Sequence, residues 1–312
     1  MKSSEQNTDT LLMIEPVEFS YNPQTAINNY FQQDQHEDNP EDDAAQKLAL
    51  AEFKAMVAKL RNEGIDIIVE KDTPYPHTPD SIFPNNWISF HSDGQVIIYP
   101  MFAENRRLER RMDVFLSVEK YMGKLYRLTD ISKYELEERF LEGTGSIVLD
   151  RENNIAYASI SQRTDKSLFL QYCSHMNFHP FYFHATQMYE NARLPVYHTN
   201  VMMCVADKFA VVCFESIENR DERHNLEKEL KKSGKQIVDI SLEQMNRFAG
   251  NMLQVKNKSG QKFMILSQAA YDSLNKIQID IIAAENKLIV IPIPTIEKRG
   301  GGSVRCMVAE IF

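Results

Sequence analysis

Cysteine is scarce in this 312-residue chain, and its spacing excludes the usual cysteine-based architectures. The four cysteines are Cys173, Cys204, Cys213 and Cys306. They have neither the paired spacing of a metal site nor the density of a disulfide-stabilised protein. Cys204 and Cys213 lie in apolar, strand-like stretches, so we expect both to be core thiols.

Long apolar runs and basic clusters are also missing. No segment is long enough to cross a bilayer, and residues 1–10 lack the apolar run of a signal peptide. The net charge is −9, from 35 Lys and Arg against 44 Asp and Glu, and no basic cluster interleaves with aromatic residues. This composition argues against nucleic acid or a membrane as a partner and favours a small-molecule ligand in a cytoplasmic protein. The oligomeric state, homo-oligomers included, is left open.

What the chain does contain is a repeat. With 43% hydrophobic residues it can bury a large core, and a strand–turn–strand pattern returns roughly every 50 to 60 residues. The predicted hairpins, with their turns in parentheses, are Trp87 to Tyr99 (Asp93-Gly94), Ser146 to Ser161 (Glu152-Asn153-Asn154), Val201 to Phe214 (Asp207-Lys208), Met252 to Ser267 (Lys258-Ser259-Gly260), and Ser303 to Phe312 paired with Leu11 to Ile14.

Helices and short third strands complete the units. Helical spacing of apolar residues predicts helices over Ala44 to Asn62 and Arg106 to Met122, and the polar segment Gln32 to Asp43 predicts an exposed loop. The predicted third strands are Ile65 to Val69, Leu125 to Leu128, Phe181 to Phe183, Ile237 to Ile240 and Leu288 to Ile291. Five ββαβ units closing on one another predict an α/β ring of small sheets with the helices outside, in one domain over residues 1–312.

A glycine-rich turn near the end of the chain presents a cysteine. Gly300, Gly301 and Gly302 precede Ser303-Val304-Arg305-Cys306. Glycines allow close backbone approaches, and the adjacent Arg305 guanidinium together with clustered amides would favour the nucleophilic thiolate. Taken alone, the segment is equally well explained as an ordinary turn with a buried cysteine.

Polar residues recur at equivalent places in the five units, about 11 to 17 positions after each third strand, where a loop enters the mouth of the ring. These residues are Asn86, Glu142, His198 with Asn200, Asn251 and Cys306. Each has an ordinary alternative: the segment at Glu142 reads as a turn, and His198 reads as a core histidine. Pseudo-symmetry would nevertheless direct all of them to one axis, which indicates a common site.

In these residues the chain resembles the amidinotransferase and arginine-deiminase superfamily, the guanidino-group-modifying enzymes of the pentein fold. The matching residues are Leu141-Glu142-Gly143, Arg163 in an Arg-Thr pair, His198, and the turn ending in Cys306. The resemblance implies that Cys306 attacks the central carbon of a guanidinium or ureido group and that His198 shuttles protons. It also implies that Glu142 binds substrate nitrogens and that Arg163 holds an α-carboxylate.

Two departures bear on the substrate. Arginine-handling relatives place further carboxylates where this chain has Asn86 and Asn200, although Asp80 could swing in. Amides both donate and accept hydrogen bonds, so they suit a neutral ureido group. Together with Phe83 in Phe83-Pro84-Asn85-Asn86-Trp87, the pattern resembles the citrulline-utilisation hydrolases. This predicts hydrolysis of citrulline to ornithine, ammonia and carbon dioxide through an S-carbamoyl enzyme, without a metal or an organic cofactor.

Alternatives remain open at this stage. Hydrolysis of arginine or a substituted arginine, or transfer of an amidino group to an amine, would use the same cysteine, and Asp80 reaching the guanidinium would favour them. A non-catalytic pentein scaffold, as in the ribosome-associated translation factor of this fold, is more remote. For Asn251 the sequence suggests only that it lines the mouth or braces Cys306.

Overall fold

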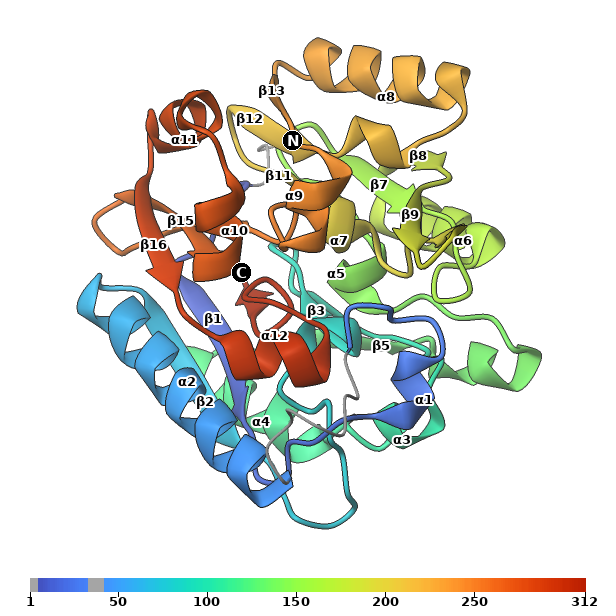
Figure 1. The fold of residues 1–312 in the computed structure, drawn as a ribbon. Helices are drawn as coiled ribbons and strands as arrows, with labels where there is room; N and C mark the ends of the chain where they lie inside the picture. The colour runs from blue at the N-terminus through green and yellow to red at the C-terminus, as the bar shows by residue number, and fades with distance from the viewer. Residues whose placement is uncertain (1–4, 33–41) are drawn as a thin grey trace.

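Five three-stranded sheets dominate residues 5–32 and 42–312, the part of the chain that the computed structural model describes (Figure 1). In each sheet two strands pair antiparallel, as a hairpin in four of the five, and a third strand pairs in parallel with one of these two. The sheets are β3 (Ile88–Phe90), β4 (Gln95–Ile98) and β5 (Arg127–Asp130); β6 (Val148–Asp150), β7 (Ile155–Ser159) and β8 (His179–Phe183); β11 (Met203–Val205), β12 (Phe209–Val212) and β13 (Gln236–Asp239); β14 (Leu253–Lys256), β15 (Lys262–Ser267) and β16 (Lys287–Ile291); and β17 (Ala309–Ile311), β1 (Thr10–Glu15) and β2 (Asp66–Lys71).

The fifth sheet joins the two ends of the chain. Strand β1 pairs antiparallel with β17, Thr10 opposite Ile311, and parallel with β2. The first strands of the hairpins lie next to one another, with β17 against β3 and β11 against both β6 and β14. These short inner strands therefore surround the axis of a closed ring.

A helix connects the second and third strands of each unit, as a parallel connection requires. These helices are α2 (Asp42–Asn62), α4 (Met112–Met122), α6 (Lys166–Met176), α8 (Arg220–Lys232) and α11 (Lys276–Ala283). Figure 1 shows α2, α8 and α11 at the periphery. Local signals set their ends: the Asp165 side chain accepts a hydrogen bond from Leu168 N at the start of α6, and α4 stops at Gly123, whose backbone is left-handed.

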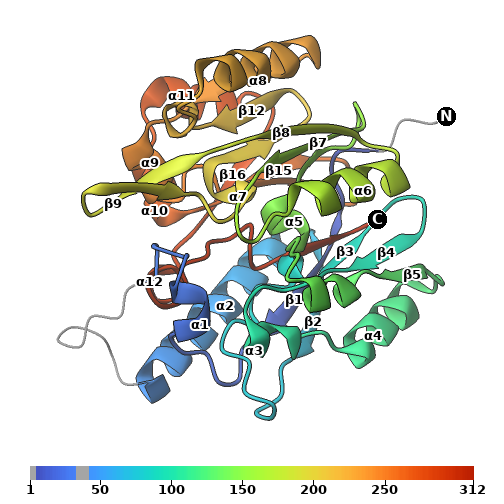
Figure 2. The same cartoon turned by 90° about the vertical axis from the view of Figure 1, so that its right-hand side faces the viewer.

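Short helices precede most of the inner strands and carry the polar residues of the repeat. The short elements are α1 (Pro23–Ala26), η1 (Pro84–Asn86), α3 (Glu104–Arg107), η2 (Ser132–Glu137), α5 (Gly143–Ser146), α7 (Thr199–Met202), η3 (Phe214–Ser216), α9 (Leu242–Asn246), α10 (Gln268–Ser273) and α12 (Pro294–Gly300). In Figure 2, α1 and α12 lie together at one end of the molecule. Side-chain amides of the segment after α1 bind α12: Asn29 donates to Gly300 O and Gln32 donates to Arg299 O.

Four predicted hairpins are confirmed, and so is the predicted pairing of the last segment, whose strand β17 pairs with β1, but three details differ. The predicted helix Arg106 to Met122 is wrong: it is broken into α3 and α4, because Arg106 and Glu109 turn inward as a buried ion pair and Arg111 is extended. The third strand predicted at Leu125 to Leu128 begins at Arg127, and Leu125 is exposed. A hairpin of β9 (Thr186–Tyr189) and β10 (Ala192–Pro195) was not foreseen. The loop predicted over Gln32 to Asp43 lies almost wholly outside the described residues.

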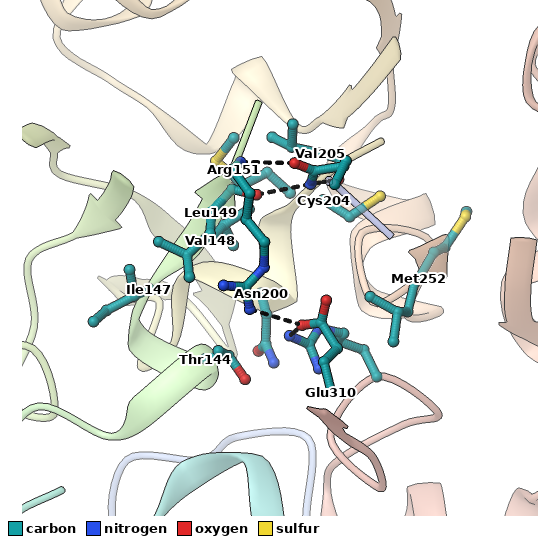
Figure 3. A pocket seen from close by; sticks show the side chains of 14 residues that line it. Thr144, Ile147, Val148, Leu149, Arg151, Asn200, Cys204, Val205, Met252 and Glu310 are labelled. Atoms are coloured by element: carbon teal, nitrogen blue, oxygen red, sulfur yellow. Dashed lines mark hydrogen bonds and ion pairs between the residues drawn. The ribbon is translucent and has the colours of Figure 1, made fainter. Parts of the chain in front are cut away.

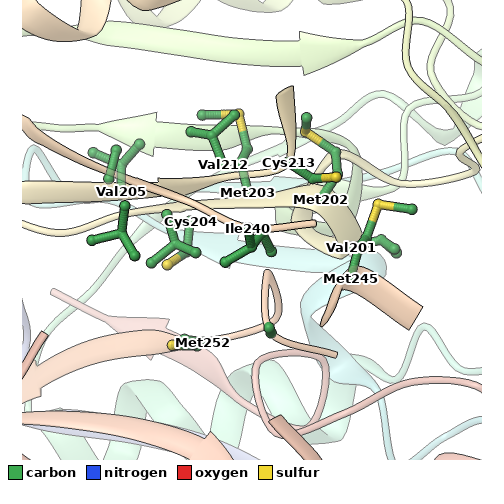
Figure 4. Close-up of a cluster of buried hydrophobic side chains, with 14 of the residues drawn as sticks. Val201, Met202, Met203, Cys204, Val205, Val212, Cys213, Ile240, Met245 and Met252 are labelled. Atoms are coloured by element: carbon green, nitrogen blue, oxygen red, sulfur yellow. The ribbon is translucent and has the colours of Figure 1, made fainter. Parts of the chain in front are cut away.

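The largest core cluster of the described residues centres on the third unit and extends into the second and fourth units (Figure 4). Cys204 and Cys213 pack in it among residues such as Val201, Val212 and Met252. Burial raises the pKa of the Cys204 thiol to about 12 and that of Cys213 to about 11. Both are buried core thiols, as the sequence predicts.

Candidate active site

A narrow, closely packed cavity of about 10 Å³ lies where the short helices meet at the axis. Side chains and turns from the first, second, third and fifth units, together with the segment around α1, enclose it. The lining residues are Thr25, Asn29, Asp80, Phe83, Asn86, Arg106, Arg163, Tyr197, His198, Gly300, Gly301, Gly302 and Cys306. Of the eight site residues predicted from the sequence, the cavity thus contains Cys306, His198, Asp80, Phe83, Asn86 and Arg163.

Cys306 lies in the tight turn that follows α12. Its N–H donates to Ser303 O at 2.9 Å. Its Sγ accepts hydrogen bonds from two side-chain amides, Asn251 Nδ2 at 3.4 Å and Asn200 Nδ2 at 3.6 Å. A Cβ on Gly302 would lie 2.9 Å from the Phe83 ring and 3.3 Å from the Cys306 Cβ, so only glycine allows the turn to pack this closely. Phe83 thus forms the wall behind the thiol.

The expected role of the Arg305 guanidinium is wrong. Arg305 turns away from the thiol, donating to Glu310 Oε2 at 2.7 Å and to Val308 O at 3.1 Å. The donors that reach the sulfur are instead the side-chain amides of Asn200 and Asn251.

His198 and Glu142 form a buried pair, with 2.7 Å between His198 Nε2 and Glu142 Oε2. Burial lowers the pKa of His198 to about 4, although Glu142 opposes the shift. Burial by itself raises the pKa of Glu142, but the Arg163 guanidinium and the His198 hydrogen bond bring it down to about 2. At neutral pH the imidazole is therefore neutral and its Nε2–H donates to the carboxylate, which leaves Nδ1 as the basic nitrogen.

The Glu142 carboxylate has more partners within the protein than the resemblance implied. Its Oε1 accepts from Phe102 N at 2.8 Å, and its Oε2 also faces Arg163 Nη1 at 3.5 Å. Both oxygens thus have partners within the protein. This arrangement supports a role in holding His198 rather than in binding substrate nitrogens.

Arg163 is almost completely buried and is held by several groups. Its Nε donates to Asn28 Oδ1 at 2.8 Å, its Nη2 donates to Thr25 O at 2.7 Å, and its guanidinium lies over the Tyr197 ring. The guanidinium therefore links the segment around α1 to Glu142. Its contacts support this bracing role at least as well as the carboxylate-binding role implied by the resemblance.

Asp80 and Asn86 present the polar atoms that are available to a substrate. Asp80 Oδ2 accepts from Asn22 Nδ2 at 2.7 Å, whereas Asp80 Oδ1 is buried without a partner among the described residues. Asn86 Oδ1 accepts from Arg106 Nη1 at 2.7 Å, and Asn86 Nδ2 likewise has no described partner. Buried polar atoms without partners are costly, so this pair indicates a ligand.

Gly145 explains how the second unit accommodates this arrangement. A Cβ at this position would lie 2.4 Å from Asn86 Nδ2 and 2.8 Å from His198 Nδ1. The absent side chain lets α5 approach both atoms, and it places the amide donor and the imidazole base beside each other.

Asn200 does not line the cavity described above. It lines a second, rear chamber of about 30 Å³ and contacts the thiol from that side. Figure 3 shows Asn200 between Thr144, Arg151 and Glu310. Glu310 Oε2 binds Arg305 and lies 3.7 Å from Arg151 Nη2. Asn200 is therefore placed to contact the nucleophile, which differs from the direct substrate contact that the sequence suggested.

Several functional neighbours were missed by the sequence reasoning. The apolar spacing predicts Arg106 and Glu109 within a helix, but Arg106 Nε and Nη2 bind the two Glu109 oxygens at 2.8 and 2.9 Å beside Asn86. Their i, i+3 charge pairing is the only signal in the sequence, and it is typical of exposed helix faces too. Asn22 and Thr25 carry no motif, and only the folded chain brings them to Asp80.

Among residues 5–32 and 42–312, no group of three or more His, Cys, Asp or Glu side chains could hold a metal ion. No helix of the same ranges is long and apolar enough to cross a membrane.

A five-bladed α/β propeller that gathers a cysteine and a histidine at one cavity, with a glutamate bound to the histidine, is the pentein fold of the guanidino-group-modifying cysteine hydrolases. The sequence model of the eukaryotic N,N dimethylarginine dimethylhydrolases matches residues 15–312, so the chain belongs to this family. It is accordingly an enzyme with a cysteine nucleophile. No curated protein matches the chain.

Solved structures share the fold. ArgZ, an arginine dihydrolase from the ornithine-ammonia cycle in cyanobacteria, superposes with a TM-score of 0.72 at 14% identity over 96% of this chain and 40% of its own. The chain thus spans less than half of full-length ArgZ, but a product-bound N-terminal domain of ArgZ is covered over 97% of both chains, with a TM-score of 0.71. A cysteine-to-serine variant of dimethylarginine dimethylaminohydrolase (DDAH) from Pseudomonas aeruginosa, complexed with citrulline, gives 0.66 at 16% identity, covering 98% of this chain and 99% of its own. At these identities the likeness establishes the pentein fold.

Proposed function

We propose that this enzyme hydrolyses the ureido group of citrulline, giving ornithine, ammonia and carbon dioxide. One observation carries the proposal: among the described residues that line the cavity at Cys306, the buried side-chain atoms without a hydrogen-bond partner are a donor, Asn86 Nδ2, and an acceptor, Asp80 Oδ1. A ureido group has a carbonyl oxygen for the donor and N–H groups for the acceptor. A guanidinium has N–H groups only, and it would leave the Asn86 donor facing another donor.

The orientation of the Asn86 amide is fixed by its neighbour. An arginine side chain has five N–H donors and no acceptor, so the Asn86 atom bound to Arg106 Nη1 must be the oxygen. Arg106 is itself held by Glu109 and donates to Phe83 O at 3.1 Å. The donor end of Asn86 therefore faces the cavity, beside His198 Nδ1.

The proposed mechanism uses these groups in turn. His198 Nδ1 takes the proton of the Cys306 thiol, and the thiolate sulfur forms a bond to the ureido carbon. Negative charge then develops on the carbonyl oxygen, where the Asn86 donor stabilises it. The protonated His198 gives its proton to the δ-nitrogen as the C–N bond breaks, which releases ornithine and leaves an S-carbamoyl enzyme.

Hydrolysis of the intermediate reverses the proton transfer. Water, losing a proton to His198 Nδ1, adds to the thioester carbon, the C–S bond breaks, and the proton returns to the sulfur. Carbamic acid leaves and decomposes to ammonia and carbon dioxide. Glu142 stabilises the imidazolium that forms twice in this cycle.

A second candidate is hydrolysis of arginine or a methylated arginine, which the printed description of the family suggests. The charge around the cavity favours it. Two arginines, Arg106 and Arg163, face three carboxylates, those of Asp80, Glu109 and Glu142, while His198 is neutral. One negative charge is left over when all three carboxylates are ionised, and a cationic guanidinium would neutralise it. Burial raises the pKa of Asp80 and of Glu109, which reduces this excess.

The test is to incubate the purified protein separately with citrulline, arginine and N,N-dimethylarginine, and to follow ornithine, citrulline, ammonia and dimethylamine. Cys306→Ala serves as the inactive control. Ornithine from citrulline alone would support the proposal. Citrulline from arginine or from dimethylarginine would establish the second candidate, and products from added acceptor amines would reveal amidino or carbamoyl transfer.

A further inference from the structure

Asn251 joins three units of the ring at the nucleophile. Its Oδ1 accepts from Arg305 N at 3.0 Å, and its Nδ2 lies 3.1 Å from Asn200 O and 3.4 Å from Cys306 Sγ. The side chain is buried. We propose that Asn251 is a positioning residue that orients Cys306 and stabilises its thiolate through a side-chain amide hydrogen bond.

The orientation of this amide follows from its two backbone partners. A backbone N–H only donates and a carbonyl oxygen only accepts, so Asn251 must turn its oxygen to Arg305 N and its nitrogen to Asn200 O. The nitrogen has two hydrogens. One satisfies Asn200 O, and the other is available to the sulfur at 3.4 Å.

The Asn251 amide donates a hydrogen bond to the sulfur at a place where neither His198 nor Arg305 supplies a positive charge. His198 is neutral, because burial lowers its pKa to about 4, and the Arg305 guanidinium points toward Glu310 instead of the sulfur. A hydrogen bond strengthens when its acceptor carries charge, so the Asn251 amide stabilises the thiolate more than the thiol. Asn200 Nδ2, at 3.6 Å, adds a second donor, and Asn251 holds the Asn200 backbone in place.

The loop that carries Asn251 is built for close approach. Gly250 packs on the third unit, where a Cβ would lie 2.4 Å from Val201 O. Asn251 N donates to Phe248 O at 2.9 Å, and α9 before it has a capping box at Ser241. The loop is therefore held by its packing on the third unit and by its own backbone hydrogen bond. The Asn251 side chain needs little movement when the sulfur becomes charged.

The experiment measures alkylation of Cys306 by iodoacetamide between pH 5 and 10, with mass spectrometry to read modification at that residue and Cys306→Ala as the blank. Asn251→Asp keeps the oxygen that accepts from Arg305 N but replaces the donor with a carboxylate oxygen. Asn251→Ala removes the donor without adding charge. Asn286→Ala is the matched control, because Asn286 is also buried and hydrogen-bonded, to Gln254 and Ile282 O, away from the cysteine.

For Asn251→Asp we expect alkylation at pH 7 to slow by about 10- to 100-fold and its half-maximal pH to rise by about one unit or more, the range of a lost charge-assisted hydrogen bond. Asn251→Ala should shift the profile in the same direction by less, and Asn286→Ala should not shift it even if the melting temperature falls. Activity on the accepted substrate should fall chiefly in kcat.

An alkylation profile that stays at the wild-type pH in both Asn251 variants would overturn the proposal, whatever happens to activity or stability. A shift of equal size in Asn286→Ala would do so as well, since it would show a general effect of loosening the fold. Alkylation needs no substrate. Failure of this test is therefore distinguishable from failure of the citrulline assignment, which would show up only in the product assays.

Discussion

Replacing Asn86 with aspartate should reverse the substrate preference of the enzyme. In the variant one carboxylate oxygen keeps the place next to Arg106 Nη1, where the amide oxygen now lies at 2.7 Å. The other oxygen replaces the Nδ2 donor and faces the reacting group. The cavity would then present two acceptors, at Asp80 and at position 86, and one more negative charge.

The magnitude follows from the hydrogen bond that is exchanged. A hydrogen bond to a charged or charging group is worth about 1.5–3 kcal/mol, which corresponds to about 10- to 150-fold in rate. Citrulline loses this interaction at the carbonyl oxygen, whereas a guanidinium gains one of similar size. The ratio of kcat/KM for citrulline to that for arginine should therefore fall by about 10²- to 10⁴-fold.

The assay is steady-state kinetics on both substrates, with ornithine and citrulline quantified separately. Asn29→Asp is the matched control, because Asn29 lines the same cavity but contacts Gly300 O and Gly301 O instead of Arg106. An equal change of preference in Asn29→Asp would mean that charge alone selects the substrate. An unchanged preference in Asn86→Asp, with the protein folded, would refute the donor–acceptor reasoning.

Three further predictions concern the histidine pair and the glycine beside it. Because burial holds the pKa of His198 at about 4, the imidazole stays neutral down to that pH. On acidification kcat/KM should therefore decline around pH 4 rather than around 6.5. A decline centred near 6.5 in the pH–rate profile would contradict this. Glu142→Gln leaves one acceptor for both His198 Nε2 and Phe102 N, and kcat should drop by about 100-fold or more. Glu135→Gln is its control, since Glu135 accepts from Met101 N and pairs with Arg110 outside the cavity, and comparable losses of activity in the two variants would argue against a catalytic role of the pair. Gly145→Ala should displace Asn86 and His198 and lower kcat/KM by about 100-fold. The control is Gly234→Ala, whose Cβ would meet nothing within 4 Å and which should lower only the melting temperature. Full activity of Gly145→Ala would show that the two side chains are not held where the structure has them.

The sequence alone determined the units of the fold. Alternating apolar runs broken by turn residues such as Asp93-Gly94 predict a hairpin wherever local backbone preferences and burial agree. Four such hairpins form, and the last predicted strand pairs with the first one as expected. The same repeat indicated which residues meet at the axis, because equivalent positions in pseudo-symmetric units point to the same place. Cys306, His198 and Glu142 could be named in this way, and Asn251 could be noted without a role.

Tertiary structure alone decided how these side chains face one another. Whether the Arg305 guanidinium or the Asn251 amide reaches the sulfur depends on Glu310, which lies in the last strand and binds the guanidinium from the rear chamber. The break between α3 and α4 likewise depends on burial of the Arg106–Glu109 pair against Asn86, a contact that helix propensity does not contain. Local preference and periodicity fix elements over a few residues, but the direction of a buried polar group is set by partners distant in the sequence, and these come together only when the ring has closed.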